Sequence, residues 1–205
     1  MSDFTSMIPQ AYSWLRAMSG GKLTKSQVVA GDKVINVLGL PVFADMIGFN
    51  YLHTVTGQFD ISANGYSIIK EFEGLRLDAY LDTGGVWTIG YGTIKYMSGT
   101  RVAKGDKISV EDAEANLMND CKWVDACLDK KVTAKLNQNQ FDALASFVYN
   151  IGESQFGSST LLRKVNAGDF VGAASEFDRW VFDNGKRIEG LAKRRAKEKA
   201  LFLKK

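Results

Sequence analysis

Histidine and cysteine are scarce in this chain of 205 residues, which contains one His and two Cys. A zinc site needs several His, Cys or carboxylate ligands, and the common hydrolase triad needs a His base. His53 alone, without any Cys-x-x-Cys pair, argues against both kinds of site, and we expect no metal and no cofactor. Cys121 and Cys127 fall in one expected helix, about 9 Å apart along its axis, which is beyond disulfide reach. Both should be reduced, buried thiols.

A secretion signal and a membrane span are also lacking. The N-terminal segment contains Asp3 and Arg16 and no apolar stretch of the signal-peptide type. The longest apolar run, residues 34–49, contains Asp45 and is shorter than the roughly 20 residues that a spanning helix needs. We therefore expect a core helix there, and neither a signal peptide nor a transmembrane helix.

Charge is nearly balanced over the whole chain but not along it. The apolar fraction of 45% and the charged fraction of 24% are ordinary for a globular protein, and a net charge of +3 indicates no particular partner. Residues 186–205, however, carry nine Lys or Arg against two Glu. We expect this end to form an amphipathic basic helix with Leu191, Leu201 and Leu203 as its apolar positions. Such a surface is usually only solvated, but it also attracts polyanions.

Two carboxyl groups, Glu73 and Asp82, are the strongest candidates for chemistry. A helical pattern runs into Glu73 and is expected to end at Gly74, because glycine enters the left-handed conformation at little cost. The negative end of that helix disfavours a second negative charge, so Glu73 is suited to hold a proton. Asp82 precedes the turn-forming residues 83–85 and should be wetter and ionised. A proton donor beside an ionised carboxylate is the pair that glycoside hydrolysis uses.

The residues around this pair resemble a known family. Glu73-Gly-Leu-Arg, Tyr80, Asp82 and Thr88-Ile-Gly-Tyr-Gly are similar to the active-site segment of the phage-type lysozymes, or endolysins, of glycoside hydrolase family 24. Four further blocks agree in order, namely Leu136-Asn-Gln-Asn-Gln-Phe-Asp-Ala-Leu, Ser146-Phe-Val-Tyr-Asn-Ile-Gly, Ser159-Thr-Leu-Leu-Arg and Gly190-Leu-Ala-Lys-Arg-Arg. The resemblance covers roughly residues 60–205. Thr93 departs from it, since many relatives carry His there.

The resemblance implies a muramidase. Glu73 would protonate the glycosidic oxygen between N-acetylmuramic acid and N-acetylglucosamine, while Asp82 and Thr88 would position water on the opposite face. Inversion at the anomeric carbon is then expected, although the carboxyl separation that decides it is not readable from sequence. Without the family resemblance, Thr88 would be interpreted as an ordinary strand residue.

The resemblance also implies supporting residues. Tyr80, Tyr149 and Asn150 match positions of the substrate cleft. Arg194 or Arg195 matches the arginine that pairs with the catalytic Glu, and the alignment favours Arg194. The alternative reading of these arginines is a solvated basic face.

The expected fold class is α+β and lysozyme-like, with a mainly helical lobe, a small antiparallel sheet lobe and a cleft between them. The expected domains are a small all-α unit over residues 1–58 and a muramidase domain over residues 59–205. The predicted elements are helices over 8–18, 24–38 and 42–52, a sheet within 77–95, and helices from Ser109, from Asn137 or Asn139, and over 159–166, 169–180 and 191–203. The unit 1–58 is open to three readings: a structural extension, a cell-wall-binding module, or a membrane-associated segment.

The predicted partner is peptidoglycan, with lipopolysaccharide or anionic wall polymers as a further target of the basic helix. We expect a monomer that binds no specific nucleic acid and stays in the host cytoplasm until a phage holin releases it to the periplasm. Two other functions remain open: a non-catalytic peptidoglycan-binding or morphogenetic protein on a lysozyme fold, and a lytic transglycosylase. The transglycosylase needs no water-activating Asp, so Asp82 and Thr88 disfavour it.

Overall fold

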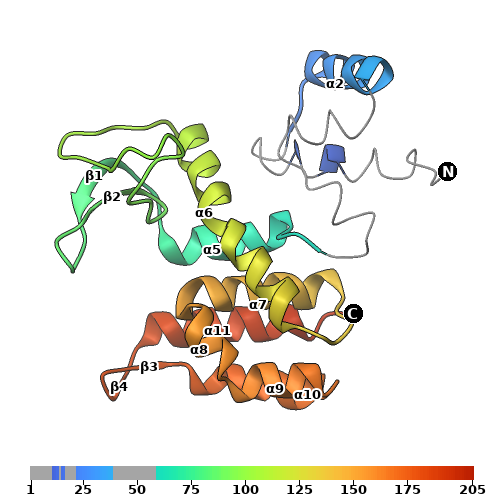
Figure 1. The fold of residues 1–205 in the computed structure, drawn as a ribbon, viewed down its shortest axis with the longest axis vertical. Helices are drawn as coiled ribbons and strands as arrows, with labels where there is room; N and C mark the ends of the chain where they lie inside the picture. Colours follow the sequence, from blue (N-terminus) through green and yellow to red (C-terminus); the bar gives the residue numbers. More distant parts are fainter. Residues whose placement is uncertain (1–10, 14, 17–21, 39–58) are drawn as a thin grey trace. The chain divides into compact units, whose positions relative to one another are not determined.

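The structure is a computed structural model that describes residues 11–13, 15–16, 22–38 and 59–205. The chain divides into two compact units, residues 1–63 and 64–205, which are described separately (Figure 1).

The described part of the first unit is helical. Helix α2 (Lys25–Leu38) begins after Thr24, whose amide donates to Gln27 Oε1 at 2.7 Å, while the Gln27 amide donates back to Thr24 Oγ1 at 3.3 Å. This is the predicted capping box. Tyr12 is buried with its hydroxyl 2.9 Å from both the Val28 carbonyl oxygen and Asp32 Oδ1. Burial, together with Asp32, raises the pKa of Tyr12 to about 12. Tyr12 is therefore a packing residue and not an exposed sugar platform.

Several predictions for this unit lie outside the described residues. They concern the helix over 42–52, the single histidine His53, and both ends of the helix over 8–18, of which residues 11–13 and 15–16 are helical.

The second unit combines helices with two short antiparallel hairpins. Its elements in chain order are α5 (Ala63–Glu73), β1 (Arg76–Leu81), β2 (Trp87–Gly90), α6 (Val110–Lys131), α7 (Gln138–Ile151), α8 (Glu153–Gly157), α9 (Thr160–Asn166), α10 (Phe170–Glu176), the 3-10 turn η2 (Phe177–Arg179), β3 (Phe182–Asp183), β4 (Lys186–Arg187) and α11 (Glu189–Phe202). Strands β1 and β2 and the loops after them form the sheet lobe, and α6 runs from that lobe down to the other helices (Figure 1). The α+β expectation is confirmed.

Capping residues place the two long helices where the sequence predicts them. Ser109 Oγ accepts from the Asp112 amide at 3.0 Å, and Asp112 bonds back to the Ser109 backbone, which completes the predicted capping box of α6. Asn137, one of two candidates, caps α7 by accepting from the Gln140 amide at 2.8 Å. Each cap satisfies an amide that the helix itself leaves unpaired.

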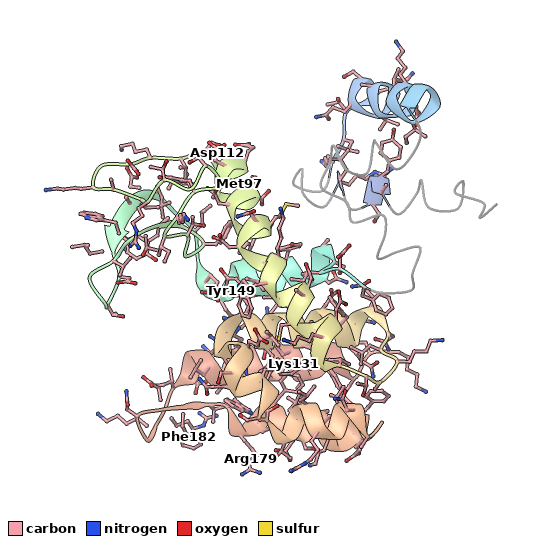
Figure 2. The ribbon with its side chains drawn as sticks, in the orientation of Figure 1. Met97, Asp112, Lys131, Tyr149, Arg179 and Phe182 are labelled. Atoms are coloured by element: carbon pink, nitrogen blue, oxygen red, sulfur yellow. The ribbon has the colours of Figure 1, made fainter. Side chains whose placement is uncertain are left out.

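The hairpin of β3 and β4 is absent from the sequence prediction, although a signal for it exists. Its turn is Asn184-Gly185, with φ values of 46° and 76°, and this dipeptide is a strong short-range hairpin signal. The strands have only two residues each, so no apolar alternation marks them. Phe182 on this hairpin is 58% exposed and extends from the lower edge of the helical lobe (Figure 2).

Aromatic side chains form the centre of the helical lobe. Phe147 of α7 is fully buried and makes edge-to-face contacts with three rings, with centroid distances of 6.4 Å to Phe156, 5.1 Å to Phe177 and 5.4 Å to Trp180. Such contacts add to the stabilisation that the buried area supplies. Helix α7 is therefore the central element of this lobe, and its last turn carries Tyr149 and Asn150.

The C-terminal helix differs from its prediction. Helix α11 buries three charged and two apolar side chains, namely Arg194, Arg195, Glu198, Leu201 and Phe202. Leu203, expected on an apolar face, lies beyond the helix end and is exposed. The amphipathic basic helix is therefore wrong as predicted, because ion pairing within the lobe places charges on the buried side.

Two lysines of α11, Lys197 and Lys199, are paired as well. Lys197 Nζ lies 2.6 Å from Glu71 Oε1, and Lys199 Nζ lies 2.6 Å from Asp178 Oδ2. Part of the basic charge at this end is thus neutralised inside the chain.

Substitution of Gly90 by Ala is expected to lower the free energy of unfolding by about 1–2 kcal/mol. Gly90 ends β2 with φ 66°, and an added Cβ would lie 3.3 Å from Ala113 Cβ on α6. Urea denaturation measures the change. Gly190→Ala is the control, since that helical glycine has open space and an ordinary φ; its stability should be unchanged or higher by up to about 1 kcal/mol. Equal stability of both variants would contradict the close approach of β2 to α6.

Candidate active site

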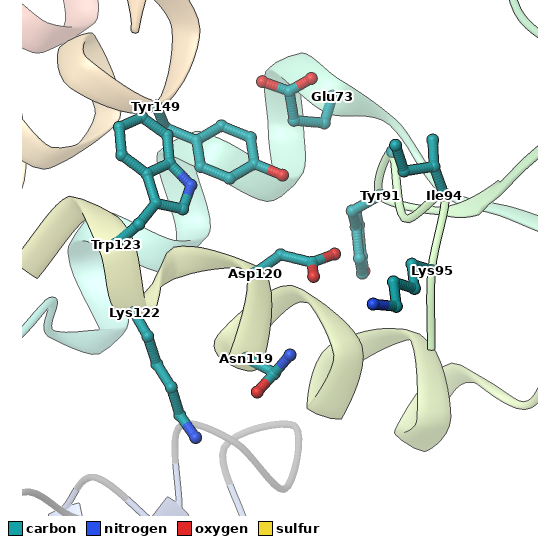
Figure 3. A pocket seen from close by; sticks show the side chains of 10 residues that line it. Glu73, Tyr91, Ile94, Lys95, Asn119, Asp120, Lys122, Trp123 and Tyr149 are labelled. Carbon is teal, nitrogen blue, oxygen red and sulfur yellow. The ribbon is translucent and has the colours of Figure 1, made fainter. Parts of the chain in front are cut away.

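A cavity of about 670 Å³ lies in the second unit beside the end of α5. Its lining comes from α5, α6, α7 and the loop after β2, and consists of Glu73, Tyr91, Gly92, Ile94, Lys95, Asn119, Asp120, Lys122, Trp123 and Tyr149. Figure 3 shows Ile94 and Lys95 across the cavity from Tyr149 and Trp123, with the Asp120 carboxyl group between them.

Glu73 is the last residue of α5 and lies at one end of this cavity. The helix ends at Gly74, which has φ 72° and donates its amide to the Lys70 carbonyl at 3.1 Å. The predicted glycine stop is therefore present. The Glu73 side chain is 25% exposed, so one part faces the cavity while another is held by the protein.

Arg194 holds that carboxyl group. Its Nη1 donates to Glu73 Oε1 at 2.7 Å, across 121 positions of sequence. Arg194 is itself only 3% exposed, and its Nη2 donates to the Ser146 carbonyl oxygen at 3.0 Å. Because both ends of the guanidinium group are bonded, Glu73 has a fixed and charged neighbour. Of the two candidate arginines, Arg194 makes this contact.

Asp82 and Thr88 lie on the hairpin of β1 and β2. Asp82 Oδ1 accepts from the amides of Gly84 at 2.9 Å and Val86 at 2.8 Å, which fixes the carboxyl group in the turn. Thr88 is 3% exposed and donates its hydroxyl to the Val86 carbonyl at 3.1 Å. Neither residue is among those that line the cavity of Glu73.

The strand register relates these two residues to Tyr80. Tyr80 pairs directly with Thr88, and Asp82 follows Tyr80 by two positions, so the three side chains share one face of the hairpin. The Arg76 guanidinium lies 3.9 Å above the Tyr80 ring. The structure therefore brings the three predicted hairpin residues together on one side of the sheet lobe.

Tyr149 and Asn150 are neighbours in sequence but occupy different places. Tyr149 lines the cavity and stacks with Trp123, with ring centroids 6.5 Å apart. Burial raises the pKa of the Tyr149 hydroxyl, and Cys121, Glu73 and Asp120 add to this effect, so the group is a neutral hydrogen-bond donor. Asn150 is exposed and accepts from Arg195 Nη2 at 3.0 Å, outside the cavity lining.

The sequence prediction missed Asp120 and Trp123, which line the cavity from α6. Burial raises the pKa of Asp120, although the Thr93 hydroxyl opposes this shift by donating to Oδ2 at 2.6 Å. Trp123 is 41% exposed, so part of its ring offers an apolar surface to the cavity. A tryptophan directly after Lys122 on a long helix was the available signal. Thr93, which departs from the family pattern, thus has a defined role, because its hydroxyl binds Asp120.

Cys121 and Cys127 are free and buried. Among the described residues, no group of three or more His, Cys, Asp or Glu is arranged to hold a metal ion. Within the same part of the chain, no helix has the length and apolar character needed to cross a membrane.

Comparison with known proteins identifies the family. The family model described as phage lysozyme matches residues 70–198, which is more than half of the chain. The chain belongs to the phage lysozyme family. Among its relatives, this phage lysozyme is 47% identical over 146 residues to an endolysin of Acyrthosiphon pisum secondary endosymbiont phage 1, a match that spans 69% of this chain and 97% of that protein. It is 43% identical over 143 residues to the endolysin of Salmonella phage P22, spanning 70% of this chain and 97% of the relative.

Solved structures agree with this assignment. A mutant of P22 lysozyme superposes with a TM-score of 0.68 at 39% identity, covering 72% of this phage lysozyme and all of the other chain. The lysozyme-like fold expectation is therefore confirmed.

Proposed function

We propose that this phage lysozyme hydrolyses the β-1,4 bond between N-acetylmuramic acid and N-acetylglucosamine in peptidoglycan, for lysis of a host cell. The observation that carries the proposal is the contact between Glu73 and the buried Arg194 at the wall of the cavity. A carboxyl group held there by a second side chain is pre-positioned for proton transfer, which is what an acid catalyst requires.

Glu73 is proposed as the general acid. It gives its proton to the glycosidic oxygen as the bond from that oxygen to the anomeric carbon of N-acetylmuramic acid breaks. The resulting carboxylate remains in contact with the Arg194 guanidinium. A charge-assisted hydrogen bond of this kind stabilises the ionised product of the step.

Asp82 and Thr88 are proposed to supply water from the hairpin. Two backbone amides bind Asp82 Oδ1, which leaves Oδ2 to take a proton from the attacking water. The Thr88 hydroxyl donates to Val86, so its oxygen is able to accept a hydrogen bond from the same water. Attack on the face opposite the leaving oxygen inverts the anomeric carbon and leaves a reducing N-acetylmuramic acid end.

The remaining predictions concern partners and location. Tyr80, Tyr149 and Asn150 are proposed to contact the glycan, and residues 1–58 to form a cell-wall-binding module or a structural extension. A monomeric state, release to the periplasm with a holin, and binding of the basic end to lipopolysaccharide stay predictions. The internal pairing of Lys197 and Lys199 lowers the charge available for that last interaction.

Product analysis tests the function directly. We expect purified peptidoglycan to be converted to muropeptides with reducing N-acetylmuramic acid ends. NMR of the first products should show the anomeric configuration opposite to that of the substrate, because water attacks in a single displacement. Retention of configuration would remove Asp82 from the role of general base. Products ending in 1,6-anhydromuramic acid would identify a lytic transglycosylase, and binding without cleavage would identify a non-catalytic wall-binding protein.

A further inference from the structure

A cluster of charged side chains outside the cavity lining is buried in contact with Glu73. Arg194, Arg195 and Glu198 of α11 have side chains that are 3%, 1% and 0% exposed. Replacing a buried ion pair by apolar side chains of similar volume is often neutral or stabilising, so a buried ion cluster is weak evidence for a role in stability. The role of this cluster is not explained by stability alone.

Glu198 is the centre of the cluster. Its Oε1 accepts from Ser146 Oγ at 2.7 Å, from Arg194 Nε at 3.1 Å and from Arg195 Nη2 at 3.0 Å. All three partners donate to the same oxygen. Glu198 therefore joins α11 to α7 and binds both arginines at once.

The second oxygen of Glu198 identifies its charge state. Arg195 Nε lies 2.7 Å from Oε2 in an ion pair that lacks hydrogen-bond alignment, and neither atom has another hydrogen-bond partner in the described structure. A proton on Oε2 would face this N–H group, donor against donor. Burial raises the pKa of Glu198, and the two guanidinium groups oppose that shift. We assign the carboxylate form because two buried guanidinium groups supply its counter-charge and a proton on Oε2 would oppose the Arg195 Nε–H group.

Arg194 links Glu198 to Glu73, so the position of Glu198 affects that of Glu73. Its Nε binds Glu198, its Nη2 binds the Ser146 carbonyl oxygen, and its Nη1 binds Glu73. The guanidinium group is planar and rigid, so fixing two of its nitrogens fixes the third. Without Glu198, the Nε contact is lost and Arg195 loses its anionic partner.

We propose that Glu198 is a positioning residue for catalysis, which holds Arg194 in the orientation that places the Glu73 carboxyl group at the cavity. The inference rests on the proposed function of Glu73. Arg195 extends the same cluster to the end of α7, where it binds Asn150 next to the cavity residue Tyr149. Glu198 thus connects to the site through both arginines, although it touches no substrate.

The test is Glu198→Gln, which keeps the shape of the side chain and removes its charge. With its oxygen on Arg194 Nε, the Gln side chain would place an NH2 group against Arg195 Nε, donor against donor, so the arginines should shift. We expect kcat on soluble peptidoglycan fragments to fall by about 10²-fold, the loss that a displacement of about 1 Å at a reacting group can cause. KM should be unchanged, because no residue of the cavity lining is substituted and the proposed role of Glu73 is in bond breaking and not in substrate binding. Assays are run at a temperature at which circular dichroism shows the variant to be folded.

Glu176→Gln is the matched control. Glu176 is also a buried glutamate with two cationic partners, Lys164 at 2.6 Å and Arg179 at 3.5 Å, and it lines no part of the cavity. Its loss should lower the melting temperature and leave kcat unchanged. Equal losses of kcat in the two variants would overturn the proposal, since Glu198 would then act through stability alone. A folded Glu198→Gln enzyme with wild-type kcat would also overturn it.

If Glu198→Gln does not fold, Ser146→Ala tests the positioning role of Glu198 instead. This variant removes one donor to Glu198 and keeps every charge, so kcat should fall by a smaller factor at unchanged KM. Wild-type kcat in Ser146→Ala would then overturn the proposal. An inactive wild-type enzyme would instead refute the proposed function, which separates the two failures.

Discussion

Glu73→Gln is expected to lower the rate of peptidoglycan hydrolysis by about 10²–10⁴-fold, the usual contribution of a general acid. Gln has nearly the same shape and its amide oxygen can still accept from Arg194, so the fold should persist. It has no proton acidic enough to protonate a leaving oxygen. The measurement is the initial rate of reducing-sugar release from purified peptidoglycan.

Glu71→Gln is the control for this experiment. Glu71 is on the same helix two positions earlier, is about half exposed, and pairs with Lys197 instead of Arg194. Exposed ion pairs contribute about 0–1 kcal/mol to stability, so its loss should change neither rate nor fold. Wild-type activity of Glu73→Gln would show that another group supplies the proton. Asp120, the other carboxyl group in the cavity lining, would then be the next candidate for the general acid.

Phe147→Ala is expected to lower the free energy of unfolding by about 3–5 kcal/mol, the usual cost of deleting a buried aromatic ring. The ring is fully buried, touches three other aromatic rings, and lies 4.8 Å from the Arg195 guanidinium carbon. Removing it leaves a cavity at the centre of the helical lobe and uncovers one face of the buried arginine. Chemical denaturation followed by circular dichroism measures the effect.

Phe182→Ala is the matched control for Phe147→Ala. Phe182 is 58% exposed on the β3 and β4 hairpin, so its removal should change stability by less than about 0.5 kcal/mol. A loss in Phe147→Ala no larger than in Phe182→Ala would contradict the packing of α7 at the centre of the lobe.

The two carboxyl groups of the site are held by different kinds of structure. Glu73 ends a helix and is bound by a buried side chain from the other end of the chain, whereas Asp82 is bound by the amides of its own turn. The proposed acid thus depends on tertiary packing and the proposed base on local geometry. Substitutions in the helical lobe should therefore change the position of Glu73 more readily than the conformation of the hairpin that carries Asp82.

Local structure was predictable because short-range chemistry determines it. Gly74 marks the end of α5, the Ser109 and Asp112 capping box begins α6, and Asn137 caps α7, all through contacts within about four residues. The family resemblance added the order of the motifs and the expectation that Arg194 meets Glu73. The hairpin at Asn184-Gly185 was missed because its strands are too short to show a period.

The amino-acid sequence by itself determined most helices of the second unit, the caps of α6 and α7, the Asp82 turn and the family. Only the tertiary structure decided which charges of the C-terminal helix are solvated and which are buried. The same run of basic residues contains Lys197, exposed and paired with Glu71, and Arg194, buried against Glu73 and Glu198. Composition cannot separate them, because the energy of a charge depends on the partners and the dielectric around it, and these come from residues far away in the chain.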